Sequence, residues 1–181
     1  MEYTVEITAY CPHECDYCST SATRQGEHID MGDIASFLAG ATSQDRINIS
    51  GGEPLAHPRF WEILQCCRSI TNDVWVYTNA LDKIRYNAGV VPEITVEANV
   101  CLVPGQAAYI PKGASRVRLL QLVPQGRARD MTPANISVSG NICGKCEECN
   151  HLVLQANGKI ANGPCKKEGV EPVIDSSQQE G

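Results

Sequence analysis

The cysteines constrain the fold of this 181-residue chain most, because seven of the ten fall into two compact groups. The N-terminal group is Cys11, Cys15 and Cys18, and the C-terminal group is Cys143, Cys146, Cys149 and Cys165. In a reducing compartment, clustered thiols are typical of metal sites and not of disulfides. The other three, Cys66, Cys67 and Cys101, are compatible with small buried residues. Any fold of this chain must therefore gather each group of thiols at one point.

The start of the chain and its overall charge narrow the functional classes. The first seven residues carry two acids and no basic residue, so we expect neither a secretory signal nor a transit peptide. No stretch approaches the run of about 18 apolar residues that a membrane span needs. We therefore expect a cytoplasmic protein with no membrane partner. The net charge of −6 argues against non-specific nucleic-acid binding as the main role.

Strand and helix patterns alternate along the first 123 residues, which predicts an α/β fold with a parallel sheet. Strands are expected at 4–9, 46–50, 74–77, 94–103 and 117–123, and a weak helix at 81–86. Prolines and glycines leave little room for a helix between 103 and 116. We therefore predict an incomplete (β/α)6-like barrel, open on one side.

Two helices have recognisable starts. Asp30 is the expected N-cap of the first, with Asp33 as its capping-box partner and Gly40 at its end. Pro58 is the expected first residue of the second. The predicted apolar face of this second helix consists of Phe60, Ile63, Leu64 and Cys67.

The composition changes after the barrel, which divides the chain into three parts. Residues 1–130 form the predicted barrel, and 124–134 read as a linker. Residues 131–167, with short strands, glycines and cysteines, form a predicted C-terminal extension built on a β-hairpin. The Ser/Gln-rich residues 168–181 are expected to be disordered.

The N-terminal cysteines have the spacing C-x3-C-x2-C directly after a strand. Iron–sulfur clusters are normally held by four thiolates, so three ligands leave one iron open. An amine and a carboxylate, such as the methionine end of S-adenosylmethionine, can chelate that iron. A zinc site, with His13 as a nearby fourth ligand, and an ordinary electron-transfer cluster are the alternatives.

A second motif, Gly51-Gly52-Glu53-Pro54, follows the next strand. The glycines allow a ligand to approach the backbone closely, and exposed carbonyls together with Glu53 can accept hydrogen bonds from an ammonium group. The order of the two motifs, C-x3-C-x-aromatic-C after one strand and Gly-Gly-Glu-Pro after the next, resembles that of the radical S-adenosylmethionine superfamily. The resemblance implies a [4Fe–4S] cluster on Cys11, Cys15 and Cys18, and reductive cleavage of S-adenosylmethionine to a 5′-deoxyadenosyl radical.

The resemblance implies further cofactor contacts. Tyr17 is expected near the adenine, and Thr78, in a Thr-Asn-Ala turn like the family's Thr-Asn-Gly turn, is expected to face the cofactor. Glu97 and Asn99 share one face of a strand, and of the two we favour Asn99 as a ligand of the ribose or the carboxylate. Two residues, Arg127 and Arg129, could clamp an anionic substrate or the cofactor carboxylate, although surface arginines are commoner.

The C-terminal cysteines flank a predicted hairpin with a two-residue turn at Asn157-Gly158, which pairs Ala156 with Lys159 and folds Cys165 back beside the other three. Four thiolates can bind either a second cluster or a structural zinc ion. The segment from Cys146 to Cys165 resembles the C-terminal cluster segment of the GTP 3′,8-cyclase family, which implies an auxiliary [4Fe–4S] cluster. That family is longer and has no counterpart of Cys143, so GTP cyclisation is not expected.

These features predict an enzyme that abstracts hydrogen from an unidentified substrate and takes electrons from a flavodoxin or ferredoxin. A wide, open barrel mouth favours a peptide, protein or RNA segment over a small metabolite. An activase of a glycyl radical enzyme is one alternative. A non-enzymatic iron–sulfur or zinc protein is another, and it would yield no 5′-deoxyadenosine.

Overall fold

A computed structural model describes residues 1–79, 97–103, 105, 116–121, 126–132 and 151–162 of the chain. The helix predicted at 81–86, the disordered tail and all four C-terminal cysteines lie outside these described residues. None of the helices in the described ranges is long and apolar enough to cross a membrane.

The described strands form two sheets. The larger has the order β3-β2-β1-β6-β7, from β1 (Glu2–Glu6), β2 (Arg46–Ser50), β3 (Val74–Val76), β6 (His151–Leu154) and β7 (Ile160–Asn162). Its strands run parallel except β7, which is antiparallel to β6. The second is a parallel pair, β4 (Glu97–Leu102) and β5 (Arg116–Gln121). All five predicted barrel strands exist: β2 has the predicted bounds, and each of the other four differs by one to three residues at one or both ends. The mixed α/β architecture fits a partial barrel.

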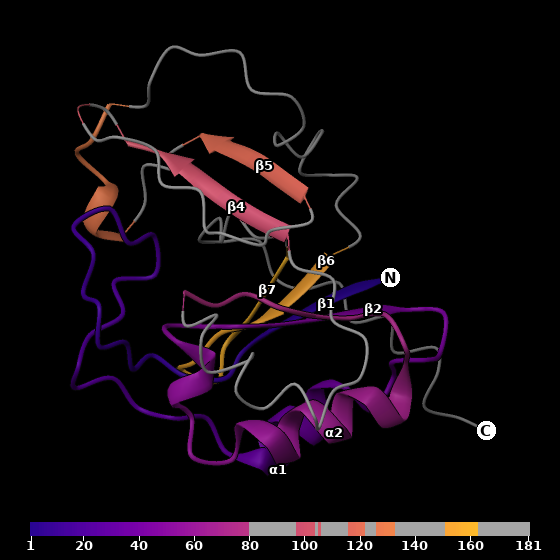
Figure 1. Cartoon of the computed structure of the whole chain (residues 1–181). Helices are drawn as coiled ribbons and strands as arrows, with labels where there is room; N and C mark the ends of the chain where they lie inside the picture. Colours follow the sequence, from indigo (N-terminus) through magenta and orange to yellow (C-terminus); the bar gives the residue numbers. More distant parts are fainter. Residues whose placement is uncertain (80–96, 104, 106–115, 122–125, 133–150, 163–181) are drawn as a thin grey trace.

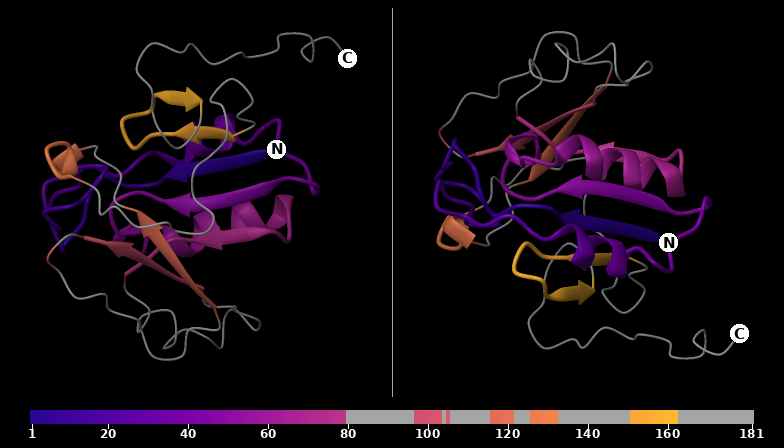
Figure 2. Two further views of the ribbon diagram at one scale, coloured as in Figure 1. Left: turned by 90° about the horizontal axis from the view of Figure 1, so that it is seen from above. Right: turned by 90° about the horizontal axis from the view of Figure 1, so that it is seen from below.

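The layers are visible in Figure 1, where two helices cover one face of the larger sheet and β4 and β5 lie beyond the other face. Both views in Figure 2 place the hairpin of β6 and β7 at the opposite edge from β4 and β5. The face of the larger sheet that looks away from the helices is therefore the inner face of the partial barrel.

The helices begin close to where the sequence predicts. Helix α1 (Met31–Phe37) is capped by Asp30, whose Oδ1 accepts the Gly32 N–H at 2.7 Å. Helix α2 (Phe60–Ile70) starts two residues after Pro58, so the prediction that Pro58 is its first residue is wrong. The His57 imidazole caps the bend before α2 instead, because its Nδ1 accepts the Arg59 N–H at 3.0 Å.

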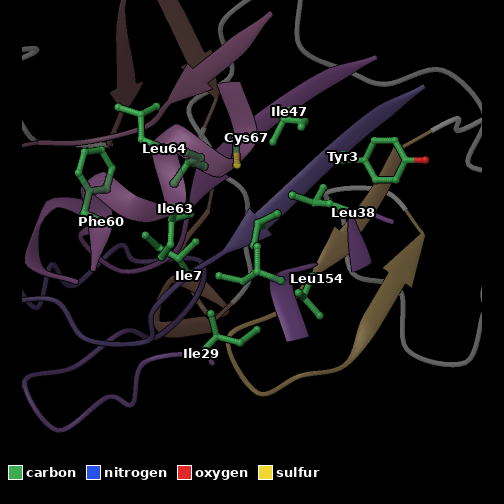
Figure 3. Packing of buried hydrophobic residues seen from close by; sticks show 13 residues of the cluster. Tyr3, Ile7, Ile29, Leu38, Ile47, Phe60, Ile63, Leu64, Cys67 and Leu154 are labelled. Carbon is green, nitrogen blue, oxygen red and sulfur yellow. The ribbon is translucent and has the colours of Figure 1, made fainter. Parts of the chain in front are cut away.

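The core lies between the larger sheet and the two helices. On β1, Tyr3 and Val5 alternate with polar residues and point to the helices, as a period of two predicts. From α2, the four predicted core residues are all buried: Phe60, Ile63, Leu64 and Cys67. Figure 3 shows these side chains converging with Ile7 and Ile47. Burying each large apolar side chain stabilises the fold by about 1.5–3 kcal/mol.

The inner face of the larger sheet is polar. Asn48 Nδ2 donates to Glu2 Oε1 at 2.7 Å and to Thr4 Oγ1 at 3.1 Å. The Thr4 hydroxyl also contacts His151 Nε2 at 2.6 Å, which ties β6 to β1 through side chains as well as through the backbone. Burial lowers the pKa of His151, and the charge of Glu2 opposes that shift only in part. These bonds satisfy most of the polar groups named here, and Asn48 Oδ1 is buried without a partner in the described part of the chain.

The hairpin of β6 and β7 differs from its predicted register by one residue. Leu154 pairs with Ile160, and the Gln155 N–H donates to the Lys159 carbonyl at 2.8 Å. The turn therefore has three residues and not two, and Gly158 takes the left-handed conformation at φ 79° that such loops require. That residues 131–167 form a separate cluster-binding extension stays a prediction.

Candidate functional site

The candidate site lies at the carboxyl edge of the parallel strands, where α/β folds bind ligands. The cysteine loop, defined as residues 7–29, connects β1 to α1 at this edge. The short helix η1 (Pro54–Ala56) follows β2 there, and Thr78 follows β3. Figures 1 and 2 show a further short helix, η2 (Gly126–Ala128), lying beside the cysteine loop.

The cysteine loop has a fixed backbone path. Its two limbs pair, with the Cys11 N–H donating to the Thr23 carbonyl at 2.8 Å and the Thr23 N–H donating to the Ala9 carbonyl at 3.1 Å. The tip turns tightly, since the Cys18 N–H donates to the Cys15 carbonyl at 3.1 Å. Two non-glycine residues in the loop, Glu14 and Ser21, have positive φ angles of 45° and 55°. Strained residues of this kind are concentrated at functional sites.

The thiols of Cys11, Cys15 and Cys18 are all free, the first buried and the others half-buried. In the described part of the chain, no three His, Cys, Asp or Glu side chains converge closely enough to bind a single metal ion. His13, the fourth ligand considered for a zinc site, is exposed. In a [4Fe–4S] cluster each thiolate binds a different iron, so the sulfurs need not meet at one point. The donor set of three free thiols on one ordered loop therefore fits such a cluster.

The surroundings of Cys18 favour its thiolate, the form that binds iron. Burial by itself would raise the pKa of this thiol. Hydrogen bonds from the Thr20 hydroxyl and from nearby backbone groups, together with the positive charge of Arg127, outweigh burial and lower the pKa overall. The Sγ–Oγ1 distance to Thr20 is 3.3 Å.

The two glycines of the second motif hold the cysteine loop against the end of β2. The Gly52 N–H donates to the Thr8 carbonyl at 2.6 Å, and the Glu53 N–H donates to the Tyr10 carbonyl at 2.9 Å. A Cβ on Gly52 would overlap the Tyr10 carbonyl, and one on Gly51, whose φ is 133°, would overlap that of Thr8. The sequence predicts glycines here for the approach of a ligand, and the structure adds the approach of the chain's own backbone.

Glu53 organises the ends of two strands. Its buried carboxylate accepts the Leu55 N–H at 3.1 Å and the Thr78 hydroxyl at 2.6 Å on Oε1, and the Asn79 N–H at 3.0 Å on Oε2. The structure thus brings together Glu53 and Thr78, two residues that the sequence selects separately. Pro54 is buried beside them as the first residue of η1.

Exchanging Glu53 for glutamine tests this arrangement. In the Glu53→Gln variant, one of the two carboxylate oxygens is replaced by an amide nitrogen, which cannot accept the N–H or O–H bond made there. We therefore expect this variant to lose about 2 kcal/mol of unfolding free energy. Chemical denaturation measures the loss. Glu62→Gln, on the exposed side of α2, is the matched control and should change little. Equal effects of the two variants would contradict the role of Glu53.

Arg127 reaches the cysteine loop from η2. Its Nε donates to the Cys15 carbonyl at 2.8 Å, and its Nη1 donates to the Ala22 carbonyl at 2.8 Å. Arg129 is exposed, and its backbone N–H donates to the Gly126 carbonyl at 3.3 Å. The two arginines, which the sequence suggests as a pair, therefore have different surroundings. The sequence of the predicted linker at 124–134 does not indicate that this segment contacts the cysteine loop.

The other predicted site residues are placed less fully. Tyr17 lies half-buried at the tip of the cysteine loop, between two of the thiols in sequence. Asn99 lies on β4 opposite Arg118 of β5, and only its backbone position is described. Its role as a cofactor ligand stays a prediction, as does that of Tyr17.

Sequence reasoning missed a polar cluster formed by the two ends of the cysteine loop and His57. The Thr8 hydroxyl contacts His28 Nδ1 at 2.8 Å, and the His28 and His57 rings meet edge to face with centroids 4.8 Å apart. Burial lowers the pKa of the His57 imidazole. The hydrogen bond between this ring and the Ile29 carbonyl raises the pKa in part, and the nearby charges of His28 and Arg59 lower it further. Isolated histidines at positions 28 and 57 carry no sequence pattern that could reveal such a pair.

The lowered pKa of His57 predicts a pH dependence of stability. In the unfolded chain this imidazole takes up a proton below about pH 6.5, whereas the folded state resists it, so stability should fall as the pH decreases below that value. Denaturation midpoints at about pH 7.5 and pH 5.5 measure the slope. His57→Asn, which keeps an acceptor near the Nδ1 position, should reduce the slope, and the exposed His13→Asn should not. An unchanged slope in His57→Asn would contradict this assignment.

Comparison with known proteins agrees with the geometry. No curated protein matches this chain. Residues 5–119, which include the cysteine loop, Gly51–Pro54, Thr78 and strands β2 to β4, match the family model described as the radical SAM superfamily. Because this match covers more than half of the chain, the protein belongs to the radical SAM superfamily.

Proposed function

We propose that Cys11, Cys15 and Cys18 hold a [4Fe–4S] cluster and that the chain cleaves S-adenosylmethionine reductively to abstract hydrogen from a substrate. Membership of the superfamily implies an enzyme with such a cluster and this cofactor. The observation that carries the assignment to these residues is the set of free thiols on one ordered loop, hydrogen-bonded to the Gly52–Glu53 backbone.

The residues around the thiols would position and shield the bound groups. A cluster held by Cys11, Cys15 and Cys18 would supply an electron to the sulfonium of S-adenosylmethionine, and the protein would supply orientation and exclusion of water. The backbone at Gly51–Glu53 lies at the carboxyl edge next to the loop, where its carbonyls can accept from the cofactor ammonium. Glu53 supports this edge from beneath, since it joins η1 to Thr78 and Asn79. Tyr17 and Asn99 complete the proposed cofactor contacts.

We also propose an auxiliary [4Fe–4S] cluster on Cys143, Cys146, Cys149 and Cys165. The support is the register of β6 and β7, whose last pair is Leu152 with Asn162. In the sequence, Cys149 and Cys165 follow the two open ends of this hairpin, each three positions beyond that pair, which favours a shared site. A low-potential donor such as a flavodoxin or ferredoxin would reduce the clusters, and the proposed substrate is a peptide, protein or RNA segment.

Anaerobic reconstitution followed by a cleavage assay tests both proposals. About eight irons per chain are expected for two clusters, and about four for the N-terminal cluster alone. Incubation with dithionite and S-adenosylmethionine should yield 5′-deoxyadenosine, measured by liquid chromatography and mass spectrometry. A cluster-loaded protein that forms none would overturn the proposed activity. Retention of zinc with about four irons would overturn the auxiliary cluster and leave the activity standing.

A further inference from the structure

The side chain of Arg127 ties the cysteine loop to a segment more than a hundred residues away. Its two bonds to the Cys15 and Ala22 carbonyls span sequence separations of 112 and 105 residues. Its backbone N–H adds a third bond, to the Cys18 carbonyl at 3.0 Å. One residue of η2 thus holds carbonyls on both sides of the loop tip and at the tip itself.

Gly126 makes this close approach possible. Its φ of 56° is in the left-handed region, and a Cβ there would lie 2.6 Å from the Cys18 carbonyl oxygen and 2.5 Å from that of Ser19. The backbone of η2 is therefore packed directly on the backbone that carries Cys18, with no room for a side chain between them. We call the pair Gly126 and Arg127 the loop clamp.

One nitrogen of the guanidinium has no partner. Arg127 Nη2 is buried and, within the part of the chain that the structure describes, forms no hydrogen bond, although Nε and Nη1 each form one. A buried N–H of a charged group without an acceptor is unfavourable, so an acceptor in the functional state is expected. The buried, unpartnered Nη2 therefore indicates an electron-rich acceptor held on this loop.

We propose that Arg127 is a positioning residue for the iron–sulfur centre: the loop clamp fixes the spacing of the cysteines, and Nη2 donates to a sulfur of the bound cluster. This inference rests on the proposed function of the N-terminal cysteines. A hydrogen bond and a positive charge beside the sulfurs stabilise the reduced cluster, which carries one more negative charge than the oxidised one. Arg127 is therefore expected to raise the reduction potential of the centre.

The test compares Arg127→Gln and Arg127→Lys with Arg129→Gln, a control at an exposed arginine just after the same short helix. The midpoint potential of the N-terminal centre is measured without S-adenosylmethionine by a redox titration followed by electron paramagnetic resonance. A Cys15→Ala sample, which lacks that centre, identifies its signal. We expect a shift to more negative potential in Arg127→Gln, a smaller shift in Arg127→Lys, which keeps the charge, and none in Arg129→Gln.

Hydrogen exchange tests the clamp on the protein as purified, whether or not a cluster is bound. The amides of Cys11, Cys18 and Thr23 are protected by bonds within the loop. In Arg127→Gln they should exchange at least about ten-fold faster than in the wild type, because the loop loses two charge-assisted anchors. Arg129→Gln should leave their exchange unchanged.

The outcomes separate this inference from the proposed function. An unchanged potential in Arg127→Gln, with weakened binding of S-adenosylmethionine, would overturn the inference and assign Nη2 to the cofactor carboxylate. Unchanged exchange in that variant would overturn the clamp. A wild-type protein that binds no N-terminal cluster would overturn the proposed function, and the donor role with it. A wild type that binds the cluster and cleaves the cofactor, with variants identical to it, would overturn the inference alone.

Discussion

Replacing Cys15 with alanine is expected to lower the rate of S-adenosylmethionine cleavage at least about a hundred-fold and to remove about four irons per chain. Cys15 is half-buried, and its carbonyl is held by Arg127, so the loop path survives when only the thiol is lost. The remaining thiols, Cys11 and Cys18, would leave the cluster with one protein ligand fewer. Iron analysis and 5′-deoxyadenosine formation measure the two effects.

Cys66→Ala is the matched control for that experiment. Cys66 is also a free, half-buried thiol, but it lies on α2, away from the cysteine loop. Its replacement should leave iron content and cleavage at the wild-type level. A Cys15→Ala protein with full iron content and normal cleavage would show that the N-terminal thiols do not hold the cluster.

Replacing Gly52 with alanine is expected to cost about 3 kcal/mol of unfolding free energy, near the upper end for overpacking. The new Cβ would overlap the Tyr10 carbonyl, and it would meet the Ala22 Cβ at 3.0 Å. Neither neighbour is the end of a flexible side chain, so the strain falls on the backbone of the cysteine loop. Displacement of that backbone should also impair cluster binding.

Denaturation and iron retention together measure the effect of Gly52→Ala. Gly40→Ala serves as the control, because a Cβ on Gly40 would meet only the Tyr3 hydroxyl at an ordinary 3.9 Å. If Gly52→Ala were as stable as Gly40→Ala and bound as much iron, the close backbone contact at the end of β2 would be refuted.

The sequence predicts well those elements whose signals are local. Strand β2 has the predicted bounds, Asp30 caps α1, and the apolar face of α2 is buried as its spacing requires. The cysteine loop and the Gly51–Pro54 motif could be recognised for the same reason, since each lies within a few residues. Element boundaries are predicted less well, as at Pro58, because helix α2 begins at Phe60 and the His57 ring accepts the Arg59 N–H before it.

Contacts between distant segments could not be predicted in this way. The partners of Arg127 lie more than a hundred residues earlier, and nothing in the sequence around Gly126 specifies them. The prediction of the turn between β6 and β7 was wrong for a different reason. Asn157-Gly158 fits a two-residue turn, but a three-residue loop with Gly158 in the left-handed conformation also fits, and the observed pairing of Leu154 with Ile160 is that of the longer loop.

The position of β6 has a consequence for how the protein is made. Because β6 pairs with one edge of β1, both edges of β1 are paired only when a strand about 150 residues later in the chain has been made. Until residue 154 emerges from the ribosome, that edge of β1 stays open to other chains, which promotes aggregation. Parallel pairing across about 150 residues also raises the contact order, so folding is expected to be slow.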